Sequence, residues 1–383
     1  MMRNRPNHII IIPDSFKGTL TAIEVCDITA RAIQDLNSEV RITKIPMADG
    51  GEGTCQAFYC AMGGELISCK VSGPYLEPKD AIYWRKDQTA VVELAAAAGF
   101  INDTNRRDPS VTSTYGVGQL ILHAIRGGCN QIILGLGGSS TNDAGLGIAA
   151  ALGARFMDES DREFIPTGGS MARIDHMDLS GLQAAIQGVQ FEVMCDVDNP
   201  LYGPQGAAHV FAPQKGADPA VVEMLDQNLR AFAGLIRNQL GINVSNIPGG
   251  GAAGGAGAGA YVFLDARLRP GAQIVLEMNR FDDLLKETDL VITGEGSLDV
   301  QSLHGKVVVT VADHAKAGQV PVVAVVGNTA GDISSVYDHG VIQIVRSIDQ
   351  CQNPEHYEKT CRQDLYNAVA KWWTIQQERS MTK

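Results

Sequence analysis

Five short segments of this 383-residue chain carry carboxylates, three of them are rich in glycine, and each follows a stretch that predicts a buried strand. The segments are PDSFKG, ADGGEGT, GLGGSSTND, CDVDNP and GEGSLDVQS. Parallel α/β sheets bind ligands at the carboxyl ends of their strands, which is where these segments would lie. We therefore expect them to line a single crevice with main-chain N–H groups, hydroxyls and acids.

The third segment is the centre of a glycine-rich stretch, LGLGGSSTNDAGLG at residues 134–147, which we call the glycine loop. It has more glycines than a chain reversal requires. Glycines allow backbone amides to approach a ligand closely, and the N-terminus of a following helix adds partial positive charge. The loop therefore predicts an anion site, with Ser139, Ser140 and Thr141 as further donors. The alternative is a flexible turn followed by a capped helix.

Two other segments place acids beside small or polar residues. Asp49 and Glu52 lie among glycines, and Glu295, Asp299 and Ser302 follow the apolar stretch DLVIT. Acids in such surroundings bind Mg²⁺ or a substrate hydroxyl, or they cap a helix. The sequence leaves both interpretations open.

Asp196 and Asp198 lie two residues apart, so their side chains share a face if the chain is extended there. Paired carboxylates suit a general base or a metal site. The alternative is an Asx turn that ends at Pro200.

Cations are scarce near these segments. The net charge is −12, and no cluster of Lys and Arg offsets it locally, which excludes a nucleic-acid-binding protein. An anionic small molecule would need individually placed cations, for which Lys17, Lys215 and Lys306 are the candidates. Each of them is otherwise an ordinary solvated lysine.

The chain contains no complete phosphate-binding fingerprint. The P-loop pattern fails at Lys306, which no Ser or Thr follows. The dinucleotide pattern G-x-G-x-x-G begins at Gly135 and Gly137, but Ser140 replaces its third glycine. Asp158 lies where a ribose-binding acid would be expected. This partial match supports, as an alternative, a nicotinamide-dependent (NAD) 2-hydroxy-acid dehydrogenase.

Strand, loop and helix patterns alternate regularly at both ends of the chain, which predicts βα units and a mostly parallel sheet. Residues 21–24 (TAIE) fit a capping box that starts a helix. From about residue 70, successive strand-like runs predict a more antiparallel region. We therefore predict an α/β protein with a discontinuous doubly wound parallel domain, residues 1–70 plus 285–383, and an inserted mixed α/β domain, residues 71–284, that carries the glycine loop.

The composition indicates a globular protein. Hydrophobic residues make up 45%, while charged residues make up only 19% and there are 42 glycines, which favours backbone-built sites over disorder. The eight cysteines show no metal-binding spacing and predict ordinary thiols in a reducing compartment. The apolar run near the N-terminus is too short for a signal or membrane segment, so we expect a cytoplasmic location without membrane contact.

Phosphoryl transfer fits these residues. It requires neutralisation of the moving phosphate, a metal ion, in-line positioning and an acid that orients the attacking hydroxyl. Backbone amides, a few lysines and several carboxylates supply those requirements. The residues alone predict a transferase that depends on Mg²⁺ and a nucleotide and acts on a small hydroxyl substrate.

Seven motifs occur in this order and are distributed over nearly the whole chain: PDSFKG, MADGGEGT, GLGGSSTNDAGLG, CDVDNPLYGPQGAA, FAPQKGA, GGGAAGG and GEGSLDVQS…GK. Together they closely resemble the bacterial type-I glycerate kinases. The resemblance implies ATP-dependent phosphorylation of D-glycerate in the cytoplasm, generally to 2-phosphoglycerate, with Mg²⁺. It also implies a flavodoxin-like domain made from both chain ends, a distinct α/β domain between them and the site in the cleft.

The resemblance also implies roles for individual residues. The residues implied to bind substrate or phosphate are Asp14, Ser15, Gly137, Gly138, Ser139, Ser140, Thr141, Asn142, Lys215, Ser302 and Lys306. The catalytic candidates are Lys17, Asp49 and Asp196, of which Asp196 would orient the glycerate hydroxyl. The metal candidates are Asp143, Glu295 and Asp299.

The chain departs from the family pattern at two positions. Ala144 replaces a glycine after Asp143, and the usual proline is absent after Gly305 and Lys306. The first departure limits how closely the backbone can approach a ligand, and the second affects the placement of Lys306.

A second alternative function is a non-catalytic phosphometabolite-binding protein. The sequence does not determine the oligomeric state, and a homodimer is compatible with it.

Overall fold

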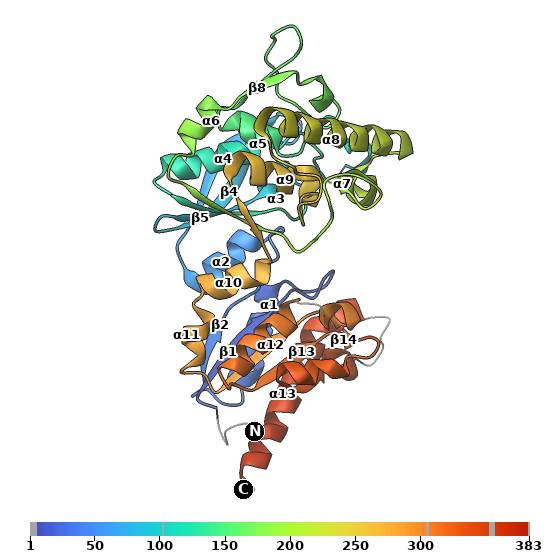
Figure 1. The fold of residues 1–383 in the computed structure, drawn as a ribbon. Helices are drawn as coiled ribbons and strands as arrows, with labels where there is room; N and C mark the ends of the chain where they lie inside the picture. Colours follow the sequence, from blue (N-terminus) through green and yellow to red (C-terminus); the bar gives the residue numbers. More distant parts are fainter. Residues whose placement is uncertain (1–5, 102, 304–305, 352–356, 382–383) are drawn as a thin grey trace. The chain divides into compact units, whose positions relative to one another are not determined.

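A computed structural model describes residues 6–101, 103–303, 306–351 and 357–381, and its contacts divide the chain into two compact units (Figure 1). Unit 1 consists of Met1–Ala48, Cys60–Gly63 and Ala272–Lys383, and unit 2 consists of Asp49–Tyr59 and Gly64–Gly271. Both ends of the chain therefore belong to unit 1. Within the described ranges, no helix has the length and apolar character that a membrane span requires.

These boundaries differ from the expected ones, 1–70 plus 285–383 and 71–284. Residues 64–70 join unit 2 because strand β3 (Glu65–Ser72) pairs along its whole length with β4 (Pro78–Lys86). Residues 272–284 join unit 1, in which helices α11 (Phe281–Leu285) and α12 (Val307–Ala317) are in contact. The α/β class itself is confirmed.

Unit 1 contains a parallel sheet covered by helices. Its strands are β1 (His8–Pro13), β2 (Arg41–Lys44), β11 (Leu290–Gly294), β12 (Ser297–Leu298), β13 (Val322–Val326), β14 (Asn328–Thr329) and β15 (Val341–Arg346). Its helices are α1 (Ala22–Gln34), α10 (Gly271–Met278, which begins in unit 2), α11 (Phe281–Leu285), α12 (Val307–Ala317) and α13 (Tyr357–Met381).

The five-stranded sheet of unit 1 has the order β15-β13-β11-β1-β2, and every pair is parallel. When the five strands of this sheet are numbered in chain order, their arrangement is the order 2-1-3-4-5 of one class of doubly wound sheets. The isoleucines of β1 are buried on both faces: Ile9 and Ile11 pack with α1 and α13, and Ile10 and Ile12 face the other side. Burial on both faces explains the unbroken apolar run. The flavodoxin-like assignment stays a prediction.

Helix α1 begins as the sequence predicts. The hydroxyl of Thr21 accepts the amide of Glu24 at 3.2 Å, and the Glu24 carboxylate accepts the amide of Thr21 at 2.8 Å. The capping box is thus complete, and it satisfies two N–H groups that have no partner inside the helix.

Unit 2 is built around a second, mixed sheet. Its strands are β3, β4, β5 (Thr89–Glu93), β6 (Gln131–Gly135), β7 (Arg155–Met157), β8 (His176–Asp178), β9 (Gln190–Met194) and β10 (Arg267–Arg269). Its helices are α2 (Thr54–Met62, which ends in unit 1), α3 (Leu94–Ala98), α4 (Tyr115–Arg126), α5 (Leu146–Ala151), α6 (Ser180–Ala185), α7 (Ala207–Phe211), α8 (Pro219–Leu240) and α9 (Ala252–Leu264).

The six-stranded sheet of unit 2 has the order β10-β9-β6-β5-β4-β3. Strands β10, β9, β6 and β5 are parallel, whereas β3, β4 and β5 form antiparallel pairs. The predicted start of a more antiparallel region near residue 70 is therefore confirmed. The carboxyl ends of β5, β6 and β9 lie side by side, and the glycine loop leaves the middle one.

Helices α4 and α5 lie side by side in Figure 1 and meet at a glycine. A Cβ atom on Gly118 of α4 would lie 2.5 Å from the carbonyl oxygen of Ile148 and 2.7 Å from Cβ of Ala151. Only a residue without a side chain allows this close approach of the two helices. Since α5 follows the glycine loop directly, the crossing helps to position that loop.

We expect Gly118→Ala to destabilise the protein by about 1 to 3 kcal/mol, because the added methyl group overpacks the contact between α4 and α5. Urea denaturation gives the change in unfolding free energy. Gly234→Ala is the matched control, since Gly234 is an exposed helix-interior glycine of α8 with no atom within 4 Å of an added Cβ. It should stabilise by roughly 0.5 to 1 kcal/mol through helix propensity. Equal effects of the two substitutions would contradict the packing explanation.

Candidate functional site

In unit 2, the glycine loop packs backbone to backbone against the segment after β2. The amide of Gly137 donates to the carbonyl of Gly50 at 3.0 Å. A Cβ on Gly137 would lie 2.5 Å from Cα of Gly51, and one on Gly135 would lie 2.4 Å from the Gly50 oxygen. These glycines are thus required by a contact within the chain, and the Gly137 amide is already used. Asp49 is exposed and accepts the amide of Gly51 at 2.9 Å.

The next residues of the loop attach it to the end of α3. The amide and the hydroxyl of Ser140 both donate to the carbonyl of Ala98, at 2.9 and 3.0 Å. The hydroxyl of Thr112 donates to the Ser140 carbonyl at 2.9 Å. Gly138 has φ +71°, a left-handed conformation that favours glycine. Ser140 therefore anchors the loop, and its predicted contact with phosphate stays a prediction.

The buried side chain of Lys215 donates hydrogen bonds to two residues of the loop. Its side chain is only 3% exposed, and Nζ donates to Oγ of Ser139 and to the carbonyl of Thr141, both at 2.7 Å. No carboxylate oxygen lies within 4 Å of Nζ among the residues with described positions. Burial lowers the pKa of Lys215 to about 7, an effect that the charge of Asp143 opposes. A buried ammonium thus sits against the hydroxyl-rich part of the loop.

Asp143 is completely buried and organises the start of two helices. Its carboxylate accepts the amide and the hydroxyl of Thr114 at 2.7 and 2.9 Å, and the amides of Gly145 and Gly147 at 3.2 and 3.3 Å. Burial raises the pKa of Asp143, and these hydrogen bonds oppose the rise. The acid therefore holds the loop against α4 and α5, while its role as a metal ligand stays a prediction.

Two neighbouring side chains of the loop are buried without partners. Oγ1 of Thr141 and both Oδ1 and Nδ2 of Asn142 make no hydrogen bond among the residues with described positions. Buried polar atoms are rarely left unsatisfied unless they serve a ligand, a water molecule or a change of conformation. Asn142 does not cap α5, whose N-cap is Gly145 and has no side-chain bond.

The segment GGGAAGGAGAG, residues 249–259, leads into α9 and packs on the glycine loop, and at its kink Ala253, Gly254 and Gly255 have left-handed backbone angles. The amide of Ala144 donates to the carbonyl of Gly254 at 3.0 Å. A Cβ on Gly254 would lie 2.1 Å from the oxygen of Thr141, and one on Gly259 would lie 2.0 Å from the oxygen of Ala144. Ala144 itself has φ +52° and is fully buried, so its methyl group is accommodated in a conformation that favours glycine.

Asp196 and Asp198 follow β9, the neighbour of β6 in the sheet, and both are exposed. The carboxylate of Asp196 accepts the amide of Gly271, the first residue of α10, at 3.0 Å. Part of its accepting capacity is therefore used by the chain. A role in orienting a substrate hydroxyl stays a prediction.

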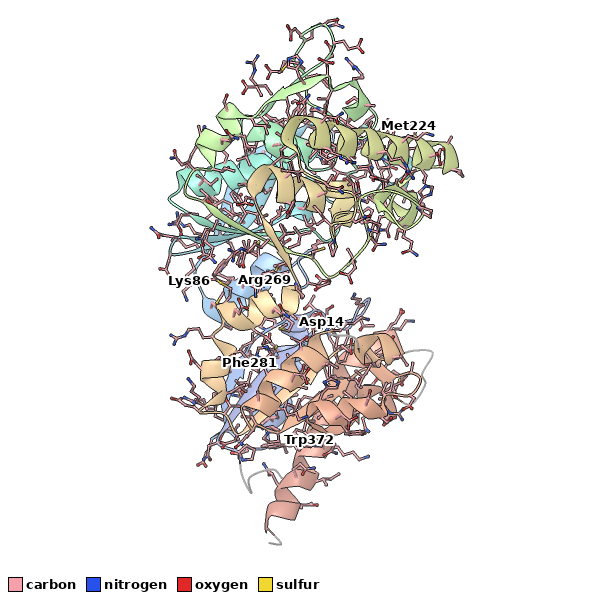
Figure 2. All side chains as sticks on the ribbon, in the orientation of Figure 1. Asp14, Lys86, Met224, Arg269, Phe281 and Trp372 are labelled. Atoms are coloured by element: carbon pink, nitrogen blue, oxygen red, sulfur yellow. The ribbon has the colours of Figure 1, made fainter. Side chains whose placement is uncertain are left out.

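In unit 1, the segments after β1 and β11 are in close contact. The amide of Asp14 donates to the carbonyl of Gly294 at 2.8 Å, and the amide of Ser15 donates to the Asp14 carboxylate at 2.6 Å. A Cβ on Gly296 would lie 3.0 Å from Cα of Phe16. Figure 2 labels Asp14, which directly follows β1, and Lys17 is exposed three residues later.

Glu295 is the buried acid of this group. It is 8% exposed, and its Oε1 has no hydrogen-bond partner in the part of the chain that the structure describes. Burial raises the pKa of Glu295 to about 7; Asp14 and Asp299 add to the rise, while Ser302 and Lys306 oppose it. Glu295 thus titrates near neutral pH.

The remaining candidates of unit 1 lie beside Glu295. The amide of Ser302 donates to the Asp299 carboxylate at 3.0 Å, and the amide of Asp299 donates to the Ser302 hydroxyl at 3.2 Å. Lys306 is exposed and is the N-cap residue of α12. Gly305, which precedes it, lies outside the described residues.

The predicted residues thus form one set in each unit. The set in unit 1 is Asp14, Ser15, Lys17, Glu295, Asp299, Ser302 and Lys306, and the set in unit 2 is Asp49, residues 137–143, Asp196 and Lys215. Searching the described ranges finds no group of three His, Cys, Asp or Glu residues that could hold a metal ion. Mg²⁺ usually takes only one or two carboxylates besides phosphates and waters, so the unpartnered oxygen of Glu295 fits that ion. The shared crevice stays a prediction.

Two residues that fix the candidate residues of unit 2 in place, Glu93 and Thr114, were not identified from the sequence. Glu93 is 7% exposed and accepts the amides of Cys55 and Gly53 at 2.6 and 3.3 Å, which fixes the segment that contains Asp49. Burial raises its pKa. The signal for Glu93 is an acid at the end of the apolar run AVVEL. Thr114, the partner of Asp143, has no comparable signal.

The geometry does not support a dinucleotide site at the glycine loop. The strand after α5 is β7, which pairs with β8 in a separate two-stranded sheet rather than beside β6. A ribose-binding acid follows a strand of the same parallel sheet. Asp158 instead accepts the amides of Ser160 and Arg162 in the turn after β7.

Comparisons with known proteins agree on one family. The family model described as "Glycerate kinase family" matches residues 9–376. A glycerate kinase of Bacillus subtilis (strain 168) is 43% identical over 336 residues, which cover 87% of this chain and 88% of that protein. Glycerate 2-kinase of Escherichia coli (strain K12) is 40% identical over 336 residues, with the same coverage of 87% and 88%.

A solved structure gives the same result. The crystal structure attributed to a glycerate kinase 2 from Salmonella typhimurium LT2 matches with a TM-score of 0.82 and 37% sequence identity. The match covers 99% of this chain and 98% of that chain. A likeness of this extent supports the mixed α/β fold over the whole length.

The buried ammonium of Lys215 makes stability depend on pH. Its pKa is about 7 in the folded protein and has an ordinary value of 10.5. Between these values the unfolded chain binds more protons, so wild-type stability rises with pH. Lys215→Met removes this dependence. We expect the stability of the variant, measured relative to wild type, to fall by about 2 to 3 kcal/mol between pH 7 and pH 9.5.

Urea denaturation at several pH values measures this difference. Lys70→Met, which removes an exposed lysine of the same unit, should show no such trend. The loss of two hydrogen bonds in Lys215→Met shifts stability equally at all pH values, so only the slope is informative. A slope equal to that of Lys70→Met would contradict the lowered pKa.

Proposed function

Because this chain belongs to the glycerate kinase family, we propose that it transfers the γ-phosphoryl group of ATP to the hydroxyl at carbon 2 of D-glycerate, with Mg²⁺. It is an enzyme, and it phosphorylates glycerate. The observation that carries the proposal is the family match over residues 9–376, which includes both sets of candidate residues. The comparisons give no support to a dehydrogenase or to a non-catalytic binding protein.

The unit 2 set supports phosphate binding. The glycine loop presents Ser139, which Lys215 holds in place, and the unpartnered polar atoms of Thr141 and Asn142. A negatively charged phosphate next to the buried ammonium would offset the cost of burying that charge. In this proposal Asp143 and Ser140 also position the loop through their hydrogen bonds.

The unit 1 set supports acid and metal chemistry. Asp14, Glu295 and Asp299 lie close enough for their charges to interact, and Lys306 reduces the repulsion. Glu295 and Asp299 would hold Mg²⁺, which when bound neutralises charge on the transferred phosphoryl group. Lys17, exposed in the segment after β1, would contact the same group.

Orientation of the attacking hydroxyl is assigned to Asp196, with Asp49 as the second candidate. Both carboxylates are exposed at the carboxyl ends of strands and each accepts one backbone amide. Such a bond fixes the direction of a carboxylate, whose two oxygens can accept several hydrogen bonds at once. A kinase needs an acid in this position to orient the nucleophile.

Two further features of the proposal concern product and location. We assign the phosphate to oxygen 2 because a relative with 40% identity is named glycerate 2-kinase. We assign the reaction to the cytoplasm because the eight cysteines, all within the described ranges, form no disulfide, which a reducing compartment favours.

The proposal predicts ADP release from ATP only when both D-glycerate and Mg²⁺ are present. A coupled assay measures ADP, and ³¹P nuclear magnetic resonance of the product identifies the phosphorylated oxygen. A spectrum of 3-phosphoglycerate would overturn the assignment to oxygen 2, whereas ADP release without glycerate would overturn the choice of acceptor.

Lys17→Ala should lower kcat/KM more than tenfold while leaving the unfolding free energy within about 0.5 kcal/mol, because a lost contact to a charged group costs on the order of 1.5 to 3 kcal/mol. Lys371→Ala is the control, since Lys371 is an exposed lysine of α13 in the same unit. Comparable activity of the two variants would remove Lys17 from the site.

A further inference from the structure

We propose that Arg107 is a substrate-binding residue that acts beside Lys215 at the glycine loop, where its guanidinium takes a carboxylate or phosphate group of one of the two substrates. The inference rests on the proposed function in that it assigns the anion to glycerate or to the nucleotide. Arg107 was not among the residues singled out from the sequence, because it lies in the polar stretch NRRDPS, which resembles ordinary surface.

Two residues that precede Arg107 in the chain contact the glycine loop. The amide of Phe100 donates to the carbonyl of Gly138 at 3.2 Å, and Gly99 and Ser139 form an antiparallel bridge. These backbone contacts attach the start of the segment to the part of the loop that presents the Ser139 hydroxyl.

Contacts on the other side attach Arg107 to the segment of Lys215. A Cβ on Gly216 would lie 2.3 Å from the carbonyl oxygen of Arg107 and 2.8 Å from its Cβ, so the two backbones touch. Lys215 itself donates to Ser139 at 2.7 Å. The residues that precede Arg107 and the side chain of Lys215 therefore both contact Ser139 of the glycine loop.

The Arg107 side chain is oriented but keeps unused donors. Its guanidinium carbon lies 5.2 Å from the centre of the Phe100 ring, and Nε donates to the carbonyl of Ile101 at 3.0 Å. Among residues with described positions, neither Nη1 nor Nη2 has a hydrogen-bond or ion-pair partner. Stacking on a ring and one fixed bond preorganise the planar fork for bidentate binding of a carboxylate or phosphate.

The charge balance supports an anionic ligand. The chain has a net charge of −12, yet neither Arg107, which is half-buried, nor Lys215, which is fully buried, has a carboxylate within 4 Å in the described part of the chain. An ammonium has three donors, and Lys215 uses two of them on neutral oxygens. Buried cations are normally paired, so the unpaired Lys215, with the half-buried Arg107 in the neighbouring segment, indicates that a ligand supplies the counter-charge.

The test compares Arg107→Met with Arg106→Met in steady-state kinetics. Arg106 is a matched control because it is the adjacent arginine, also lies over an aromatic ring, that of Tyr75 at 5.8 Å, and is exposed. Both substitutions remove one charge from the same segment. We expect Arg107→Met to raise one KM about tenfold or more and Arg106→Met to change both KM values less than twofold.

The two sources of the anion are distinguished by which KM changes. A rise in the KM for glycerate alone assigns the guanidinium to the substrate carboxylate, and a rise in the KM for ATP alone assigns it to the nucleotide phosphates. Either result supports the inference. Both KM values within twofold of those of Arg106→Met would overturn it.

A binding measurement separates this inference from the kinase proposal. Inorganic tripolyphosphate and glycerate are each added to the full-length protein, and the rise in Tm is compared among wild type, Arg106→Met and Arg107→Met. We expect Arg107→Met to lose most of the rise caused by one of the two anions, and equal rises in all three proteins would overturn the inference. If wild type released no ADP, the kinase proposal would fail, while this comparison would still decide the role of Arg107.

A second variant keeps the test decisive if Arg107→Met does not fold. Arg107→Lys retains the charge but removes the planar fork, so it should raise the same KM by a smaller factor. If Arg107→Lys has KM values and Tm rises equal to those of wild type, the bidentate role assigned here is overturned.

Discussion

The close approach of main-chain segments around the glycine loop is the constraint on which the unit 2 site depends. The loop touches the Gly50 segment on one side and α9 on the other, and at each contact a Cβ atom would overlap with backbone. Backbone cannot move aside as a flexible side chain can, so each of these positions requires glycine. Ser139 and Thr141 are thereby held in one arrangement, which Lys215 secures from the interior.

Buried ionisable groups form a second common feature of both units. Lys215 and Glu295 come from opposite ends of the ordinary pKa range, and burial moves the pKa of each to about 7. The cause is the same in both cases, because removal from water penalises whichever form is charged. Asp143 shows how the chain limits that cost, since four donors surround its carboxylate. Ionisable groups whose pKa values are shifted strongly by burial are typical of catalytic and binding sites.

Several expectations from the sequence were correct, although for reasons that the sequence does not show. The glycines after β6 predicted a surface for close approach, and the approach exists, but at Gly135 and Gly137 the partner is another part of the chain. Asp143, a metal candidate from the sequence, accepts hydrogen bonds from Thr114, Gly145 and Gly147, which the sequence did not indicate. A one-dimensional pattern identifies where small residues are needed, but it does not tell which atoms approach them.

The sequence by itself determined the α/β class, the parallel strands of unit 1, the capping box of α1 and the family, because periodicity, cap residues and ordered motifs are local properties of the chain. Only the tertiary structure decided that β3 belongs to unit 2, that Lys215 is buried against Ser139, and that Arg107 and Glu93 belong beside the glycine loop. The physical reason is that burial and partnership of a charged side chain depend on segments far away in the chain. The residue types on either side of a charged residue do not show which distant segments pack against it.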